Sequence, residues 1–253
     1  MKIFVASTGR CGTRFMRWVF REYTAVPAFH EPDPKLNGHD MAEINSGRIS
    51  PGCKKRIEEK FRFIDENTKD GYYFESSCAF IKSWAELALD RYGPDVGIIY
   101  IRRDLANLLV SWTRRGKRGR KGRFQSAFML DPETEGTLLP GFTGMSFYER
   151  AAWNYFEVAG RFYHLRNNGL GSRISRSFEM EFKNLNDPET WRNLFRTFDV
   201  QVRKEIPDKW PESADFHRSI FAPESRISGL DHLEEFWDRP AEPIPPDYNE
   251  EKK

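Results

Sequence analysis

The chain has 253 residues, enough for one domain with a substantial core, and its high aromatic content with 31% charged residues is typical of a soluble globular enzyme. Its formal net charge of +2 gives no indication of a nucleic-acid partner. The three cysteines Cys11, Cys53 and Cys78 are odd in number and lack C-x-x-C spacing, which argues against a disulfide framework or a zinc site.

The first residues predict a strand, a turn and a helix. Residues 2–6 form a short apolar run, and helical spacing follows at the apolar residues Phe15, Met16, Trp18, Val19 and Phe20. We expect this helix to end near Tyr23. A turn between a buried strand and a helix directs free backbone N–H groups and the helix dipole toward an anion.

The turn itself, residues 7–14, has the sequence Ser-Thr-Gly-Arg-Cys-Gly-Thr-Arg. Gly9 and Gly12 let the backbone approach a phosphate closely, while Arg10 and Thr13 add a fixed cation and a hydroxyl. The turn therefore predicts a site for a nucleotide phosphate, with a plain tight turn as the alternative. An ordinary ATP or GTP site is disfavoured, because the glycines are too close for a Walker A motif and no lysine precedes Thr13.

The second strand is expected over residues 25–29, and it runs into His30 and Glu31. Pro32 and Pro34 hold the preceding residues extended and stop regular structure. His30 and Glu31 thus stand at the carboxyl end of a strand. In an open parallel sheet this is where ligands bind.

The chain then alternates between helices and strands. A polar stretch over 35–55 predicts a surface loop or short helices, and the following pattern predicts, in order, a helix over 54–67, a strand over 72–81 that ends at Lys82, a helix over 84–92, a strand over 96–101 and a helix over 105–112. Asp104 can cap the last of these helices. Arg103, at the strand end, and Ser111, in the helix, are eight residues apart.

Residues 114–145 form a loop or lid that is rich in glycine and basic at its start. Seven cations fall within ten residues, namely Arg114, Arg115, Lys117, Arg118, Arg120, Lys121 and Arg123. This strip is consistent with a solvated mobile loop, a lid over a nucleotide or a binding strip for an anionic acceptor. Nucleic acid ranks lowest, because no aromatic residue is interleaved within the basic run.

The last third predicts two helices and a strand. A long helix over 147–166 is expected to contribute Trp153, Phe156 and Phe162 to the core, and a strand follows over 173–179. Asp187 and Pro188 then open a helix that runs through Phe198. We expect one domain over 1–240 and a loose Pro-rich tail over 241–253.

Two windows of the sequence resemble sulfotransferases that use 3′-phosphoadenosine 5′-phosphosulfate (PAPS). The run Thr8-Gly9-Arg10-Cys11-Gly12-Thr13, with Arg14 after it, resembles the family's 5′-phosphosulfate loop. Arg103 and Ser111 match the arginine and serine that bind the 3′-phosphate in that family, and the strand before Asp187 is a weaker match. The resemblance implies PAPS as cofactor and a three-layer α/β fold, a parallel sheet flanked by helices, related to P-loop nucleotide hydrolases.

The resemblance further implies transfer of a sulfuryl group to a hydroxyl or amine of a small-molecule or carbohydrate acceptor. Arg10 is expected to stabilise the developing charge, and Lys82 stands where several members carry a lysine that reaches the transferred group. Trp84 occupies the place of the catalytic histidine of cytosolic members. The general base is therefore expected at Glu31 first and His30 second. The alternatives are an ordinary surface lysine for Lys82 and a structural role for His30.

Other readings of the chain stay open. A P-loop kinase or nucleotide hydrolase is the main alternative enzyme, and a nucleic-acid-binding module that uses the strip over 114–123 is the alternative outside enzymes. We expect no obligatory metal and no nucleic-acid partner. No run is long enough to span a bilayer and no signal core precedes the first strand, so we expect a cytoplasmic protein without a membrane partner; nothing indicates its oligomeric state.

Overall fold

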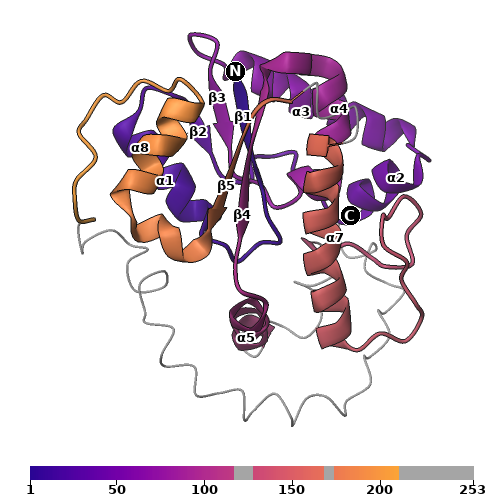
Figure 1. Cartoon of the computed structure of the whole chain (residues 1–253). Coiled ribbons are helices and arrows are strands. Elements are labelled where there is room, and N and C mark those ends of the chain that lie inside the picture. Colours follow the sequence, from indigo (N-terminus) through magenta and orange to yellow (C-terminus); the bar gives the residue numbers. More distant parts are fainter. Residues whose placement is uncertain (117–127, 168–173, 211–253) are drawn as a thin grey trace.

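The computed structural model describes residues 1–116, 128–167 and 174–210 (Figure 1). The predicted boundary at residue 240, the tail over 241–253 and the part of the basic strip from Lys117 onward lie outside these residues. In the described part of the chain, no helix combines the length and the apolar character needed to cross a membrane.

Five strands form one sheet with the order β2-β3-β1-β4-β5, and every neighbouring pair is parallel. The strands are β1 (Lys2–Ala6), β2 (Ala28–Phe29), β3 (Tyr73–Glu75), β4 (Val96–Arg102) and β5 (Ile174–Glu181). The predicted α/β fold with a parallel sheet is therefore confirmed. Because all strands run the same way, their carboxyl ends meet at one edge of the sheet.

Helices cover both faces of the sheet (Figure 1). One face packs against α1 (Thr13–Tyr23) and α8 (Pro188–Thr197), and the other against α3 (Pro51–Glu66), α4 (Ala85–Tyr92) and α7 (Phe147–Asn167). Side chains of a strand alternate between faces, so Ile3 and Val5 enter the first core while Phe4 and Ala6 enter the second.

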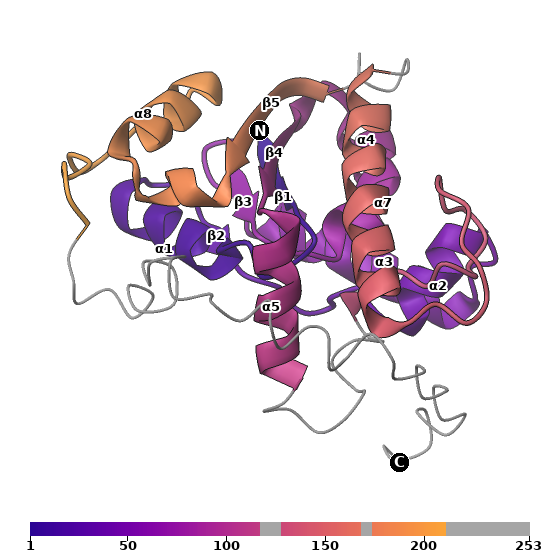
Figure 2. The same cartoon turned by 60° about the horizontal axis from the view of Figure 1, so that its bottom comes forward.

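The remaining helices lie near the carboxyl edge or beside α3. Figure 2 shows α5 (Leu105–Gly116) in front of the sheet, just past the end of β4, and α2 (His39–Ser46) next to α3. Short 3₁₀ turns are η1 (Phe80–Lys82), η2 (Gly93–Asp95) and η4 (Phe182–Asn186). The two predicted helix starts are confirmed, since the Asp104 carboxylate accepts from the Asn107 N–H and the Asp187 carboxylate from the Thr190 N–H.

Two predicted strands are shorter than the sequence suggested. The strand expected over 72–81 ends at Glu75, because the Ser77 hydroxyl and carbonyl accept from the Ala79 and Phe80 N–H groups and turn the chain out of the sheet. Lys82 consequently ends the turn η1 rather than a strand. The strand expected over 25–29 is reduced to β2, which begins after Pro27.

The expected core role of the aromatic residues of α7 is only partly correct. Trp153 and Phe162 are buried, but the Phe156 side chain is 54% exposed. Phe156 and Phe162 are six residues apart, and on an α-helix that spacing places two side chains on different faces.

Candidate functional site

The loop over 7–12 between β1 and α1, called the phosphate loop below after the site predicted there, has the backbone shape of an anion cradle. Gly9, Arg10 and Gly12 all have positive φ, at 88°, 58° and 76°. A Cβ atom on Gly12 would lie 2.4 Å from the Cδ1 atom of Leu185, so packing as well as conformation requires glycine there. Among the described residues no side chain caps the N-terminus of α1, and its first turn holds no acid. The first N–H groups of α1 are therefore suited to an anion.

The two predicted phosphate-binding pairs lie together in one site. The Arg10 Nε atom donates to the Ser111 Oγ atom over 3.2 Å, and an Arg103 guanidinium N–H donates to the Arg10 carbonyl over 3.0 Å. The contact arises because β1 and β4 are neighbours in the sheet, so the loop after β1 faces the loop after β4 and the helix α5. Residues about a hundred positions apart in the sequence thus form one cationic site.

A depression of about 500 Å³ adjoins this site at the carboxyl ends of β4 and β5. It is lined by Arg102, Arg103, Asp104, Asn107, Tyr155, Glu181, Phe182 and Lys183. The Arg103 guanidinium lies 4.2 Å from the centroid of the Phe182 ring. Sequence reasoning missed Tyr155 and Phe182, although the position of Phe182 directly after a strand of a parallel sheet was a usable signal.

Both candidate bases lie past the end of β2, where residues that follow β3 contact them. The His30 Nδ1 atom lies 2.8 Å from the Ser76 carbonyl oxygen, which can only accept, so Nδ1 carries the proton and Nε2 remains the acceptor. Burial lowers the pKa of His30, and the nearby cations Arg14 and Arg17 lower it further against the opposing effect of Glu31. His30 is thereby favoured as the neutral imidazole.

Glu31 has a positive φ of 48°. Its Oε1 atom lies 3.3 Å from the Cys78 Sγ atom, which donates to it. Cys78 also lies behind the loop, where a Cβ atom on Gly9 would come within 3.7 Å of the Cys78 Cβ atom. Cys78 therefore connects the candidate base to the phosphate loop, a role that nothing in the sequence indicated.

Lys82 lies buried against the same loop. Its Nζ atom donates to the Thr8 carbonyl over 3.0 Å and to the Phe128 carbonyl over 2.6 Å, and its side chain is fully buried. Burial lowers the pKa of Lys82. The alternative that Lys82 is an ordinary surface lysine is therefore wrong, because its ammonium group joins the phosphate loop to the segment that follows residue 127.

The cysteines of the site are packed thiols. Cys11, Cys53 and Cys78 are all free and buried. Burial raises the pKa of the Cys11 thiol, and this effect outweighs the hydrogen bond with Thr8 and the nearby cations. Burial also raises the pKa of the Cys78 thiol to about 12. No group of three or more histidine, cysteine, aspartate or glutamate side chains able to hold a metal ion occurs in the described ranges.

A buried ion pair lies directly behind Glu31. The Lys60 Nζ atom donates to the Glu75 Oε1 atom over 2.8 Å and to the Pro32 carbonyl over 3.2 Å. The Tyr73 hydroxyl donates to the other Glu75 oxygen over 2.6 Å. Lys60 and Glu75 are both fully buried. The three hydrogen bonds give the ammonium and each carboxylate oxygen a partner inside the protein. This ion pair fixes the turn that carries the candidate base.

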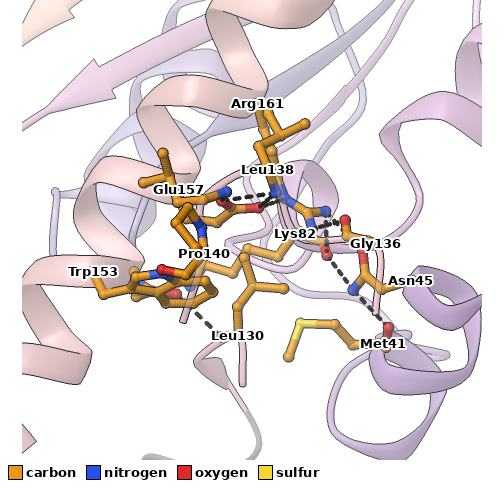
Figure 3. A network of polar contacts seen from close by, with 12 residues as sticks. Met41, Asn45, Lys82, Leu130, Gly136, Leu138, Pro140, Trp153, Glu157 and Arg161 are labelled. Atoms are coloured by element: carbon orange, nitrogen blue, oxygen red, sulfur yellow. Dashed lines mark hydrogen bonds and ion pairs between the residues drawn. The ribbon is translucent and has the colours of Figure 1, made fainter. Parts of the chain in front are cut away.

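The described part of the predicted 114–145 loop begins with the end of α5 and continues over 128–145 as a segment that is anchored although much of it is exposed. Figure 3 shows how α7 holds it: Arg161 donates to Glu157, to Asn45, to the Lys82 carbonyl and to the Gly136 carbonyl. The buried Glu157 carboxylate also accepts the N–H groups of Leu138 and Leu139, and Trp153 donates to the Pro140 carbonyl. Residues 128–145 therefore form a fixed wall beside Lys82.

This anchoring predicts a measurable loss of stability in Arg161→Met. The change removes charge-assisted hydrogen bonds and leaves the buried Glu157 without its cation, so the free energy of unfolding should fall by about 2–3 kcal/mol in urea titrations. Arg91→Met is the matched control, because it breaks the half-exposed pair between Arg91 and Asp65 and should cost about 0.5 kcal/mol or less. Equal losses in both variants would contradict the anchoring role.

The fold is similar to those of two solved sulfotransferases. A sulfotransferase from Alicyclobacillus acidocaldarius has 17% sequence identity, with 91% of this chain and 95% of that chain covered and a TM-score of 0.49. The sulfotransferase domain from the curacin biosynthetic pathway has 12% identity, with 81% of this chain and 75% of that chain covered and a TM-score of 0.50. The second likeness shows the sulfotransferase fold, as predicted. No family model matches the sequence, and no curated protein does.

Proposed function

We propose that this protein is a sulfotransferase that binds PAPS and transfers its sulfuryl group to a hydroxyl or amine of a small-molecule or carbohydrate acceptor. The observation that carries the proposal is the contact of Arg10 with both Ser111 and Arg103. PAPS has phosphate groups on both sides of one ribose, and a single site with two adjoining cationic regions suits such a ligand.

The residues of the site fit the two ends of this nucleotide. The positive φ values of Gly9 and Gly12 and the uncapped first turn of α1 leave room and N–H groups for the 5′-phosphosulfate, with Thr13 and Arg14 at the helix start. Arg103 and Ser111 would hold the 3′-phosphate. The adjoining depression offers the aromatic rings of Tyr155 and Phe182 to the adenine ring of the nucleotide.

Bound PAPS supplies a sulfuryl group on an anionic leaving group. Arg10 and the N–H groups of the loop would stabilise the charge that develops on the bridging oxygen as the bond from sulfur to that oxygen breaks. Lys82 donates to the Thr8 carbonyl and so fixes the loop that would hold the 5′-phosphosulfate. No step in this scheme requires a metal ion.

Glu31 would remove the proton of the acceptor as the acceptor oxygen or nitrogen bonds to sulfur. Its Oε1 atom accepts from the Cys78 thiol, and Cys78 contacts the phosphate loop at Gly9, so an acceptor bound beside that loop would lie near the Glu31 carboxylate. His30 is the second candidate, because its Nε2 atom remains an acceptor. The products would be the sulfated acceptor and 3′-phosphoadenosine 5′-phosphate (PAP), with the proton of the acceptor on Glu31.

Arg103→Ala should separate PAP binding from binding of 5′-AMP. Loss of the guanidinium should weaken the binding of PAP by about 10- to 100-fold in calorimetry, since charge-assisted hydrogen bonds contribute about 1.5–3 kcal/mol. Binding of 5′-AMP, which lacks the 3′-phosphate, should change by less than about threefold. The wild-type protein should also bind PAP more tightly than ATP, with or without Mg²⁺.

Arg91→Ala, which removes a cation from α4, is the control and should leave both affinities unchanged. Equal losses of PAP and 5′-AMP in Arg103→Ala would overturn the assignment of the 3′-phosphate. Preference for ATP with Mg²⁺ over PAP would favour a kinase or nucleotide hydrolase instead.

A further inference from the structure

The exposed side of α1 is a stripe of arginines. Arg14, Arg17 and Arg21 are three and four positions apart and so lie along one face, while apolar residues of the helix are buried on the other. Like charges at these spacings destabilise a helix. The stripe therefore costs stability that an anionic ligand would restore.

A fourth arginine, from a distant part of the chain, joins this stripe. Thr24 and Val202 form an antiparallel bridge, and the Arg203 N–H donates to the Tyr23 carbonyl over 2.9 Å. The Arg203 guanidinium then reaches the Arg21 carbonyl at the end of α1. Arg17, Arg21 and Arg203 line a depression of about 330 Å³ with residues 24–29.

None of these four arginines forms an ion pair with a carboxylate in residues 1–116, 128–167 and 174–210. The nearest acid on the helix, Glu22, is paired with Lys204. The polar contacts of Arg17 and Arg203 go to backbone carbonyls, which neutralise no charge. The fold thus gathers Arg17, Arg21 and Arg203 around one depression, with Arg14 further along the same face of α1. Glu22, which also lies near Arg21 and Arg203, is a single carboxylate among these cations and Lys204.

This surface leads to the candidate base. Phe29 lines the depression, and His30 and Glu31 follow it in the chain. Burial is the main cause of the lowered pKa of His30, and Glu31 opposes it. Arg14 and Arg17 also lie close enough to His30 to lower its pKa. A molecule with a hydroxyl at Glu31 can therefore place another of its groups among the arginines.

We infer that the arginine groove, defined as Arg14, Arg17, Arg21 and Arg203, binds the anionic groups of an acidic oligosaccharide that serves as the acceptor. The inference rests on the proposed function and names its substrate class. Arg14 and Arg21 are seven residues apart, a rise of roughly 10 Å on an α-helix, so the groove suits repeated carboxylates or sulfates along a chain better than one small anion.

The edge of the sheet argues against an extended peptide as the ligand. β2 is an edge strand, and a peptide would bind it through backbone hydrogen bonds. The Arg17 Nε atom, however, already donates to the Ala28 carbonyl on that edge. The groove therefore offers side-chain charge rather than an open strand, which favours a carbohydrate.

The test is calorimetry of the full chain saturated with PAP, with an unsulfated chondroitin hexasaccharide as the anionic probe and cellohexaose as the neutral one. The wild-type protein should bind the anionic probe and not the neutral one, with weaker binding in 300 mM than in 50 mM NaCl. The triple variant R17Q/R21Q/R203Q should bind the anionic probe about 30-fold more weakly, or worse. K54Q/K55Q/R62Q removes three exposed cations from α3 and should change the affinity by less than about twofold.

If the triple variant unfolds, R21Q/R203Q takes its place, because it changes only exposed side chains. This double variant should bind the anionic probe about fivefold more weakly than wild type. No binding of the probe by wild type, or equal losses in the groove and control triples, would overturn the inference. Tighter binding of hexaglutamate or of a hexanucleotide would also overturn it. PAP affinity, measured in the same samples, keeps these outcomes distinct from failure of the proposed function: PAP bound without the probe refutes the groove alone.

Discussion

Glu31→Gln should lower the turnover of PAPS by about 10²- to 10⁴-fold, the range typical of a general base. Glutamine keeps the shape of the side chain and can still accept from the Cys78 thiol, but it cannot take a proton from the acceptor. The affinity for PAP should stay within about twofold, because the nucleotide is held by other residues. Turnover is measured with radiolabelled PAPS and an acceptor found by screening, and affinity by calorimetry.

Asp33→Asn is the matched control, since it removes an exposed carboxylate two residues away in the same turn. It should leave turnover and PAP affinity nearly unchanged. Near-normal turnover in Glu31→Gln would eliminate Glu31 as the base. A large loss in His30→Gln with PAP binding intact would then assign that role to the Nε2 atom of His30.

Lys60→Met should lower the free energy of unfolding by about 3–5 kcal/mol at pH 7.5, because it leaves the buried Glu75 carboxylate without its cation. Burial lowers the pKa of Lys60 and raises that of Glu75, and both directions reflect the cost of a charge away from water. In the variant the raised pKa lets the folded state bind more protons than the unfolded state. Stability should therefore recover as the pH falls toward 5.

Two further variants make this expectation specific. Lys60→Met combined with Glu75→Leu and Tyr73→Phe removes the whole polar set and should regain most of the lost stability, because well-packed apolar residues can replace a buried ion pair. Lys55→Met breaks the exposed pair with Glu59 on the same helix and should cost about 0.5 kcal/mol or less. A combined variant as unstable as Lys60→Met alone would contradict the account.

Local sequence patterns were sufficient for the elements that lie nearest the site. The apolar run before Ser7, the glycines at 9 and 12 and the helical spacing after Thr13 predicted β1, the loop and α1, because strand, turn and helix preferences act over a few residues. Asp104 and Asp187 were found as caps for the same reason. The strand expected up to residue 81 was wrong because the serines after Glu75 bond locally.

The sequence by itself determined which residue types stand at the strand ends, and so the chemistry that the carboxyl edge can offer. Only the tertiary structure decided which of them meet: the sheet order places β1 between β3 and β4, which brings Arg10 to Ser111 and Lys82 to the Thr8 carbonyl. The arginine groove likewise depends on the bridge between Thr24 and Val202. These contacts join residues between 74 and 178 positions apart, and no pattern within a short window carries the packing free energy that selects them.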